Sequence, residues 1–256
     1  MRYAVMSDVH ANPKALAKAV VDARANDVDA FVCLGDIVGY GPTPSDAIDL
    51  AREVFGDRVV MGNHDAALLK GEAIDSFSRR ARKSIVAQRC VVGEERLGWL
   101  ESCPPLIREG SFLFVHGDVC RDGDSLKSGF GYVFRHEDVR RVLSAVEGMG
   151  VNIVFVGHTH EPAVWRLKDN GEVERLEDER IGIGPSDRYV VNVGTVGCPR
   201  SVPYSSYAVV NELPDGCVSV ELRRVRFDFG EYRDSLVEAN ADVPIWLEDL
   251  DRKSVV

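Results

Sequence analysis

Residues 30–44 read AFVCLGDIVGYGPTP, an apolar run that ends in a Gly-Asp pair. The run has the composition of a buried β-strand, and a helical stretch from about Pro44 to Phe55 follows it. Taken alone, Asp36 is a turn residue or a helix N-cap at the end of that strand. Its meaning depends on whether other strands of the chain end in the same way.

The same pattern repeats within the first 65 residues. The run RYAVM ends in SDVH before a helical stretch from about Pro13 to Ala25, and the run RVVM ends in GNHD. Continuous apolar strands that alternate with helices predict right-handed βαβ units and a parallel sheet that is covered on both faces.

Downstream, the segment from about Ile74 to Glu101 is predicted to be helical, as is the segment from about His136 to Val146. The apolar runs FLFVHGD and NIVFVGHTH flank the second of these helices. After residue 160 β-runs dominate, among them a hairpin at Asp169-Asn170-Gly171, and they form a second sheet or complete the first.

We predict a single domain over residues 1–256, because no linker-like or low-complexity stretch interrupts the chain. Within it we expect a helical insert at about 66–103 and an acidic, helical tail at about 227–256.

The bulk composition restricts the function. A formal net charge of −10 argues against non-specific binding to nucleic acid or to an anionic membrane. No apolar run approaches the roughly 18 residues of a spanning helix, and the N-terminus lacks the apolar core of a signal peptide. The six cysteines are dispersed without a CxxC pair, which predicts reduced thiols and a cytoplasmic protein. The oligomeric state cannot be inferred.

Polar side chains follow five of the apolar runs at the point where each run ends. They are Asp8 and His10, Asp36, Asn63 and His64, His116, and finally His158 and His160. Because the carboxyl ends of parallel strands meet at one edge of a sheet, we expect these side chains to converge there. Each one alone would be a turn residue, a cap or a satisfied imidazole. As a set they predict a ligand site, because independent turns have no reason to collect imidazoles at one edge.

The set offers more ligands than one tetrahedral ion accepts. It suits two divalent ions about 3.5–4 Å apart, a spacing that calls for a bridging carboxylate. His64 is then left over as an acid or base that binds no metal.

These residues resemble the calcineurin-like metallophosphoesterases. The pattern Asp8-x-His10, Gly35-Asp36, Gly62-Asn63-His64-Asp65, His116 and Gly157-His158-x-His160 matches the five motifs of that family in order. Within the family the chain is similar to the small prokaryotic phosphodiesterases. The resemblance implies an α/β fold, a four-layer α/β/β/α sandwich with two mixed β-sheets and two metal ions at the strand ends.

The resemblance also implies a role for each motif residue. Asp8, His10 and His160 would hold the first metal, Asn63, His116 and His158 the second, and Asp36 would bridge the two. His64 would be the acid near the leaving-group oxygen, and Asp65 would either orient His64 or cap the helix that begins there. The expected ions are Mn²⁺, with Fe, Zn²⁺ or Ni²⁺ as alternatives, because mixed nitrogen and oxygen ligands do not select among them.

The chain departs from the protein phosphatases of this superfamily, which usually carry Gly-Asp-x-x-Asp-Arg-Gly. Gly39 stands where an Asp would support the acid histidine, and Tyr40 stands where an Arg would grip phosphate. A diester carries one charge and depends on that guanidinium less than a monoester does, so the departure favours a diester or a polyphosphate ester. Tyr40 either contacts the substrate or packs on a neighbouring helix. Arg200 is either a substitute phosphate contact or a surface arginine, and the basic stretch 79–89 either flanks the entrance or is a solvated helix face.

We therefore predict a di-metal phosphoesterase that hydrolyses a small soluble phosphodiester by attack of a metal-activated hydroxide. The alternatives are a dinucleoside-polyphosphate hydrolase, a phosphomonoesterase or protein phosphatase with the same centre, and a non-catalytic scaffold of the same fold. The complete ligand set and the presence of His64 count against the scaffold. We expect neither nucleic acid nor a membrane as a partner, and the sequence does not name the natural substrate.

Overall fold

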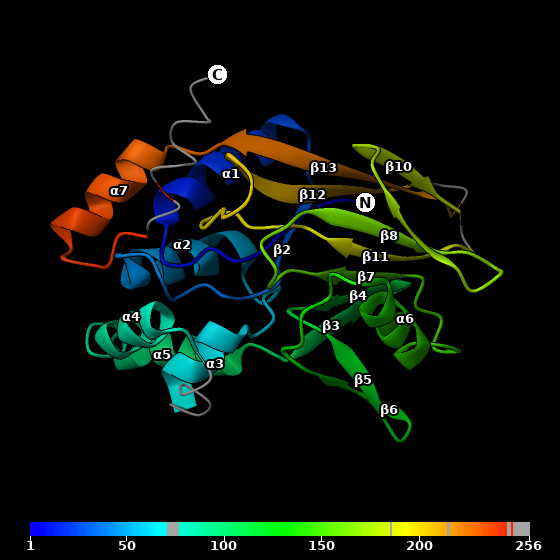
Figure 1. Cartoon of the computed structure of the whole chain (residues 1–256), viewed down its shortest axis with the longest axis horizontal. Coiled ribbons are helices and arrows are strands. Elements are labelled where there is room, and N and C mark those ends of the chain that lie inside the picture. Colours follow the sequence, from blue (N-terminus) through cyan, green and yellow to red (C-terminus); the bar gives the residue numbers. More distant parts are fainter. Residues whose placement is uncertain (71–76, 185, 214–215, 245–246, 248–256) are drawn as a thin grey trace.

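The computed structural model describes residues 1–70, 77–184, 186–213, 216–244 and 247 (Figure 1). Two mixed β-sheets form its centre, with the strand orders β10-β13-β12-β1-β2 and β3-β4-β7-β11-β8-β9. The strands of the first sheet are β1 (Arg2–Met6), β2 (Ala30–Cys33), β10 (Arg180–Ile183), β12 (Tyr204–Glu212) and β13 (Val218–Arg226). Those of the second are β3 (Leu106–Glu109), β4 (Phe112–Val115), β7 (Ile153–Val156), β8 (Ala163–Leu167), β9 (Val173–Leu176) and β11 (Arg188–Asn192).

The mostly buried strands β1, β4, β7 and β11 lie inside the two sheets, whereas the apolar strand β2 forms an edge of the first sheet. β1 pairs in parallel with β2 and antiparallel with β12, while β4, β7 and β11 are parallel to one another. These central strands are buried on both faces, because one face meets the other sheet and the other face meets helices. The edge strand β10 instead alternates buried and exposed side chains.

Three layers of apolar side chains hold the sheets and helices together. Between the sheets lie Val5, Val32, Phe114, Phe155 and Val191, and the rings of Phe114 and Phe155 stack with centroids 5.1 Å apart. Helices α1 (Pro13–Ala25) and α2 (Pro44–Phe55) pack on the outer face of the first sheet, and α6 (His136–Ala145) packs on that of the second. The predicted four-layer α/β/β/α sandwich with two mixed β-sheets is confirmed.

The remaining helices lie at one end of the sandwich (Figure 1). They are α3 (Asn63–Lys70), α4 (Arg79–Arg89), α5 (Glu94–Ser102) and α7 (Phe229–Glu238). The segment predicted to be helical from Ile74 to Glu101 thus contains α4 and α5, while its first residues, 74–76, lie outside the described residues. The predicted acidic tail contains α7, and its last residues, 248–256, also lie outside them.

The third run of the N-terminal region, RVVM, was predicted to be a strand and is not one. It forms a single parallel bridge between Val59 and Cys33, because α3 begins at Asn63 and the chain turns away from the sheet. A hairpin of β5 (Val119–Asp122) and β6 (Ser125–Ser128) projects beside the second sheet (Figure 1).

All six cysteines are free; Cys33, Cys103 and Cys198 are buried, whereas Cys90 and Cys120 are exposed and Cys217 is partly exposed. Within the described part of the chain, no helix has both the length and the apolar character that a membrane span requires.

Candidate metal centre

The seven predicted metal ligands come from five segments and meet at the carboxyl ends of the central strands. They follow β1, β2, β4 and β7 or begin α3, and all are buried: Asp8, His10, Asp36, Asn63, His116, His158 and His160. Charged and imidazole side chains are rarely buried in such number unless they pair with one another or bind an ion.

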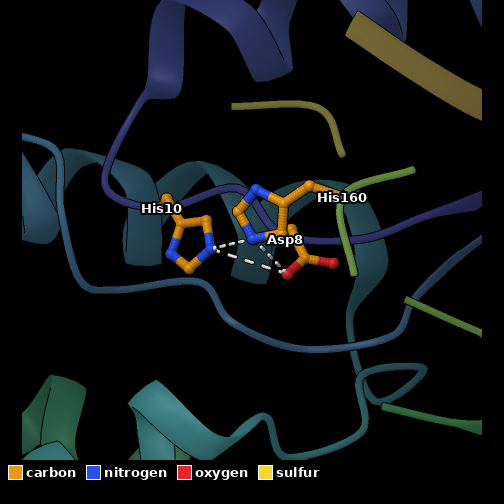
Figure 2. A group of neighbouring side chains, drawn as sticks. All are labelled: Asp8, His10 and His160. Carbon is orange, nitrogen blue, oxygen red and sulfur yellow. Dashed lines mark hydrogen bonds and ion pairs between the residues drawn. The ribbon is translucent and has the colours of Figure 1, made fainter. Parts of the chain in front are cut away.

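One cluster joins residues from the ends of β1 and β7. Asp8 Oδ1 lies 3.5 Å from His10 Nε2 and 3.1 Å from His160 Nε2, and the two imidazole nitrogens lie 3.0 Å apart. Figure 2 shows the three side chains pointing toward one another. The three ligand atoms are close enough to hold one ion.

A second cluster joins β2, β4, β7 and α3. His116 Nε2 lies 2.9 Å from Asn63 Oδ1, 3.2 Å from His158 Nδ1 and 3.4 Å from Asp36 Oδ2. Asp36, His116 and His158 again present three atoms near a common point.

Asp36 lies between the two clusters. Its Oδ2 atom is 3.4 Å from His116 Nε2 in the second cluster and 3.7 Å from His10 Nε2 in the first. Its Oδ1 atom accepts a hydrogen bond of 2.8 Å from the backbone N–H of His64, which fixes the orientation of the carboxylate. One oxygen of Asp36 thus faces both clusters.

Backbone carbonyls determine which imidazole nitrogens face the centre. Nδ1 of His10, His116 and His160 donates to the carbonyl oxygens of Val38, Leu34 and Cys198, at 3.0, 2.7 and 2.6 Å. Because a carbonyl only accepts, these Nδ1 atoms carry the proton, and Nε2 of each neutral ring presents a lone pair to the centre. Two lone pairs at 3.0 Å repel each other unless a proton or a cation lies beside them.

The Asp8 carboxylate is a second feature that suits a cation site. Its Oδ2 atom accepts hydrogen bonds from Ser7 Oγ and from the N–H of His158, at 2.6 and 2.9 Å. Its Oδ1 atom is buried and faces Nε2 of His160 and of His10, which can donate to it only when an imidazole is doubly protonated. A buried carboxylate oxygen without a donor is costly. Together with the imidazole and amide donors, it fits divalent transition-metal ions.

The electrostatics of the cluster favour positive charge. Burial lowers the pKa of His160, but the Asp8 carboxylate outweighs that effect and raises it to about 9. Burial likewise lowers the pKa of His116, and Asp36 raises it to about 9. Burial alone raises the pKa of Asp8, yet His160 and His10 hold it well below its usual range. The two buried carboxylates therefore stabilise cations at this edge of the sheets.

The backbone at the site is strained. Nine non-glycine residues of the described chain have a positive φ, and six of them line this centre. They are Asp8, His10, Asp36, Tyr40, His158 and His160, with φ between 49° and 66°. L-residues avoid this left-handed region, so the surrounding packing must hold the strand ends in it.

Glycine at position 157 permits the close approach of two of these strand ends. A Cβ at Gly157 would lie 2.0 Å from Ser7 Oγ and 2.6 Å from Asp8 Oδ2. Only glycine lets the chain before His158 pass the Asp8 carboxylate at this distance.

The comparisons with known proteins agree with this geometry. Residues 1–213 match the model of the calcineurin-like phosphoesterase superfamily domain. The chain belongs to the calcineurin-like phosphoesterase superfamily. The family resemblance is thereby confirmed, as is the prediction of a hydrolase that acts on phosphoric esters.

Several relatives of this phosphoesterase are recognisable. A metallophosphoesterase crystal structure from Sphaerobacter thermophilus superposes with a TM-score of 0.76 at 30% identity, over 100% of this chain and 98% of the other. An uncharacterized protein from Methanocaldococcus jannaschii is 29% identical over 254 residues, 95% of this chain and 94% of the relative. A symmetrical bis(5'-nucleosyl)-tetraphosphatase from Neisseria meningitidis is 30% identical over 92 residues, which cover 36% of this chain and 33% of that protein.

The sequence of this phosphoesterase has Gly39 beside the predicted acid His64, and the structure shows the consequence. His64 is buried, and its Nδ1 atom has no hydrogen-bond partner within the described residues. A Cβ at Gly39 would lie 2.1 Å from that atom, so no side chain fits there without moving the ring. His64 also lies within reach of His10 and Asp36, which makes a ligand role the alternative to the acid role.

The hydrogen bonds of Asp65 match the capping interpretation. Its Oδ1 atom accepts from the N–H of Val38 at 3.2 Å, and its Oδ2 atom accepts from the N–H of Gly62 at 3.1 Å. Gly62, the residue before α3, thus donates its backbone N–H to the side chain of Asp65, the third residue of the helix, as in one half of a capping box. Asp65 braces the loops that carry Asp36 and Asn63.

Tyr40 and Arg200 lie together in the pocket of the phosphoesterase. This pocket of about 200 Å³ is lined by Asp36, Tyr40, Asn63, His64, Phe77, Ser78, Tyr132, His158, His160 and Arg200. The guanidinium of Arg200 lies 5.0 Å from the centroid of the Tyr40 ring, and Nη2 of Arg200 lies 3.3 Å from His160 Nε2. Arg80 of α4 lies at the same distance from the Tyr40 centroid, so this ring also packs against a helix. Arg200 is partly buried and faces the predicted ligands.

Two side chains of the basic stretch 79–89 form contacts with another part of the protein. Arg80 Nε donates to the carbonyl of Asp242, and Lys83 Nζ lies 2.6 Å from Asp242 Oδ1. These two side chains therefore bind the segment after α7.

Three aromatic side chains near the centre were not identified from the sequence. Tyr132 stacks on His158 with centroids 4.2 Å apart and an interplanar angle of 16°. Phe130 approaches His116 edge-on at 6.1 Å, and Phe77 lies 4.9 Å from His64. The aromatic segment GFGYVF after FLFVHGD was the available signal for Phe130 and Tyr132, whereas Phe77 had none.

Proposed function

We propose that this protein is a di-metal phosphodiesterase that hydrolyses a small soluble phosphodiester. Asp8, His10 and His160 hold one ion, Asn63, His116 and His158 hold the other, and Asp36 bridges them. The observation that carries the proposal is the position of Asp36 Oδ2 between two clusters of inward-facing ligand atoms. Mn²⁺ is the proposed ion, with Fe, Zn²⁺ and Ni²⁺ as alternatives that the ligand types also accept.

When bound, two such ions lower the pKa of a water molecule toward neutrality and neutralise charge on the phosphate oxygens. The residues of this chain then orient the ester. Arg200 reaches the pocket from the side of His160 and can donate to a phosphate oxygen there.

His64 is proposed to donate a proton to the leaving-group oxygen. It faces the same pocket, and its ring is packed between Tyr40 and Phe77, with centroids 4.7 and 4.9 Å away. Burial lowers the pKa of His64 to about 3 in this structure, so the acid role requires the negative charge of a bound substrate to raise it again.

The pocket favours a diester over a phosphoprotein monoester. Gly39 leaves His64 Nδ1 without a carboxylate partner, and Tyr40 stands in the sequence where the protein phosphatases of the superfamily have an arginine. One guanidinium, that of Arg200, lines the pocket within the described chain, which suits an ester with a single negative charge.

A dinucleoside-polyphosphate hydrolase is the second candidate. The similarity to the Neisseria meningitidis bis(5'-nucleosyl)-tetraphosphatase supports it, although that similarity spans 92 residues. A match of 92 residues is too short to span the pocket, whose lining residues run from Asp36 to Arg200.

Chelation and reconstitution test the proposal. The purified protein, treated with a chelator and dialysed, should lose hydrolysis of bis(p-nitrophenyl) phosphate and regain it with Mn²⁺. Retained turnover in a preparation shown by mass spectrometry to be free of metal would contradict the metal requirement. A panel of cyclic nucleotides, dinucleoside polyphosphates and phosphopeptides, assayed with Mn²⁺, then separates the two candidates.

A further inference from the structure

A second, larger hollow continues from the proposed metal pocket. This groove of about 560 Å³ shares Asn63, Phe77, Tyr132 and His158 with the pocket. Its other lining residues are Met61, Ala66, Ala67, Lys70, Pro105, Ser128 and Phe130. A group attached to a phosphate in the pocket would therefore extend directly into the groove.

Aromatic rings form one wall of the groove and are exposed to solvent. Phe130 is 45% exposed and Tyr132 is 50% exposed, although large apolar side chains of this kind are usually buried. Tyr132 already stacks on His158, so its ring plane is set by the proposed metal ligand. A flat surface of this type, next to a ligand centre, is suited to stacking.

The segment that carries these rings is held in place. Asp118 Oδ1 accepts from the N–H of Gly131 at 2.9 Å, and the carbonyl of Asp118 accepts from the N–H of Gly129 at 2.8 Å. A Cβ at either glycine would lie within 2.4 Å of the Asp118 carboxylate. Arg141 of α6 lies 3.4 Å from the same carboxylate. Phe130, between the two glycines, is thus presented by a fixed backbone.

The charge of the groove restricts its occupant. Among the described residues that line it, Lys70 carries the one full charge. A chain of several phosphates would need more cations than this, whereas an uncharged planar ring would contact Phe77, Phe130 and Tyr132.

We propose that the groove binds a planar aromatic group of the substrate, so that the phosphoester hydrolysed here carries a nucleobase or an aryl ring close to its phosphorus. The proposal rests on the proposed function, because the phosphate is placed at the metal centre. Stacking on aromatic side chains contributes about 1–3 kcal/mol per ring in other proteins.

Three phosphonates of equal charge test the proposal by calorimetry on the Mn²⁺-loaded protein. Phenylphosphonate should bind about tenfold more tightly than methylphosphonate, a factor that corresponds to about 1.4 kcal/mol. Cyclohexylphosphonate, which is apolar but not planar, should bind more weakly than phenylphosphonate. Equal affinity of the phenyl and methyl compounds, or of the phenyl and cyclohexyl compounds, overturns the proposal.

Variants locate the ring. Phe130→Leu should remove most of the preference for phenylphosphonate and leave the affinity for methylphosphonate unchanged. Phe134→Leu is the matched control, because Phe134 is 48% exposed in the same segment and does not line the groove. Tyr132→Leu should also reduce the ratio of phenylphosphonate to methylphosphonate affinity, and for this variant only the ratio is read, because Tyr132 also lines the metal pocket. An unchanged preference in both groove variants contradicts the assignment.

Two comparisons complete the design. If the proposed function itself is wrong, the wild-type protein binds none of the phosphonates in a metal-dependent manner. If only the groove proposal is wrong, it binds all three with equal affinity. The affinity for adenosine 5'-monophosphate, compared with that for ribose 5-phosphate, shows whether the bound ring is a nucleobase or a simple aryl group. A larger gain from the base than from phenyl identifies a nucleobase, and a smaller gain identifies a simple aryl group.

Discussion

The Nε2 atoms of His10 and His160 face each other at 3.0 Å, while the other nitrogen of each ring donates to a backbone carbonyl. Because the lone pairs cannot turn away, a divalent cation should stabilise the folded state. At a Mn²⁺ concentration of 100 times Kd, we expect the melting temperature to rise by about 5–10 °C. His160→Asn should reduce this shift, and an equal shift in the variant and the wild type would contradict the assignment.

Asp36→Asn tests the bridge. The variant keeps an oxygen that can accept from the His64 N–H, but it loses the charge that faces both clusters. We expect bound metal, measured by mass spectrometry, to fall from two ions per chain toward one or none, and turnover to be lost. Asp57→Asn, at an exposed position, should change neither quantity. Full occupancy with normal turnover in Asp36→Asn would exclude the bridging role.

His64→Ala separates the acid role from the ligand role. Loss of a general acid should lower kcat about 10²–10⁴-fold for esters of poor leaving groups and much less for p-nitrophenyl esters. Metal content should stay at the wild-type level, and His136→Ala at an exposed position is the control. A loss of bound metal would assign His64 to the ligands, and an equal loss of rate for both ester types would reject the acid role.

Arg200→Met probes the phosphate contact. A charge-assisted hydrogen bond is worth about 1.5–3 kcal/mol, so KM should rise roughly 10-fold or more with a smaller change in kcat. Arg200→Lys should recover part of the loss, and monoesters should suffer more than diesters. Arg89→Met, an exposed residue of α4, is the control. An unchanged KM in Arg200→Met would remove this residue from the binding site.

Asp22 joins α1 to the first sheet and should make stability depend on pH. It accepts from the Tyr207 hydroxyl at 2.6 Å and from Arg223 Nη2 at 3.1 Å. Burial raises the pKa of Asp22, but the bonds from Arg223 and Tyr207 outweigh that and lower it. Because the pKa of Asp22 is lower in the folded state, the ionised carboxylate stabilises the fold at pH values above its unfolded-state pKa of about 3.9. This stabilisation is lost as the pH falls through the pKa of the folded state.

Asp22→Asn should therefore cost about 1 kcal/mol at neutral pH, or about 2–4 °C in melting temperature. The difference from the wild type should shrink below about pH 4. Asp49→Asn, which breaks an exposed pair with Arg96, should cost less. A difference that persists unchanged at low pH would contradict the ion-pair explanation.

The elements with strong local signals could be predicted from the sequence. Helices Pro13–Ala25 and Pro44–Phe55 have the predicted bounds, since each begins at a proline, which favours the first helical turn. The strand prediction for RVVM failed because its composition is that of a strand, whereas α3 begins two residues after the run and limits its pairing. The pairing of Ala4 with Val209 is a contact across 205 residues, and no local pattern encodes it.

The same division applies to the site. The ligand candidates follow apolar runs of the sequence and could be named from that position. Other contacts depend on how loops from separate strands pack. They include the hydrogen bonds of Asp65, the partial burial of Arg200 and the hydrogen bond from Gly131 to Asp118. Such contacts between loops have no periodic signature in the sequence.

The left-handed backbone at Asp8, Asp36, His158 and His160 bears on how this protein could diverge. Glycine and asparagine adopt that conformation more readily than histidine does. A descendant released from the chemistry could exchange His158 and His160 for these residues and relieve the strain. Such exchanges should therefore raise the melting temperature of the metal-free protein, while they remove the stabilisation that a bound cation would add.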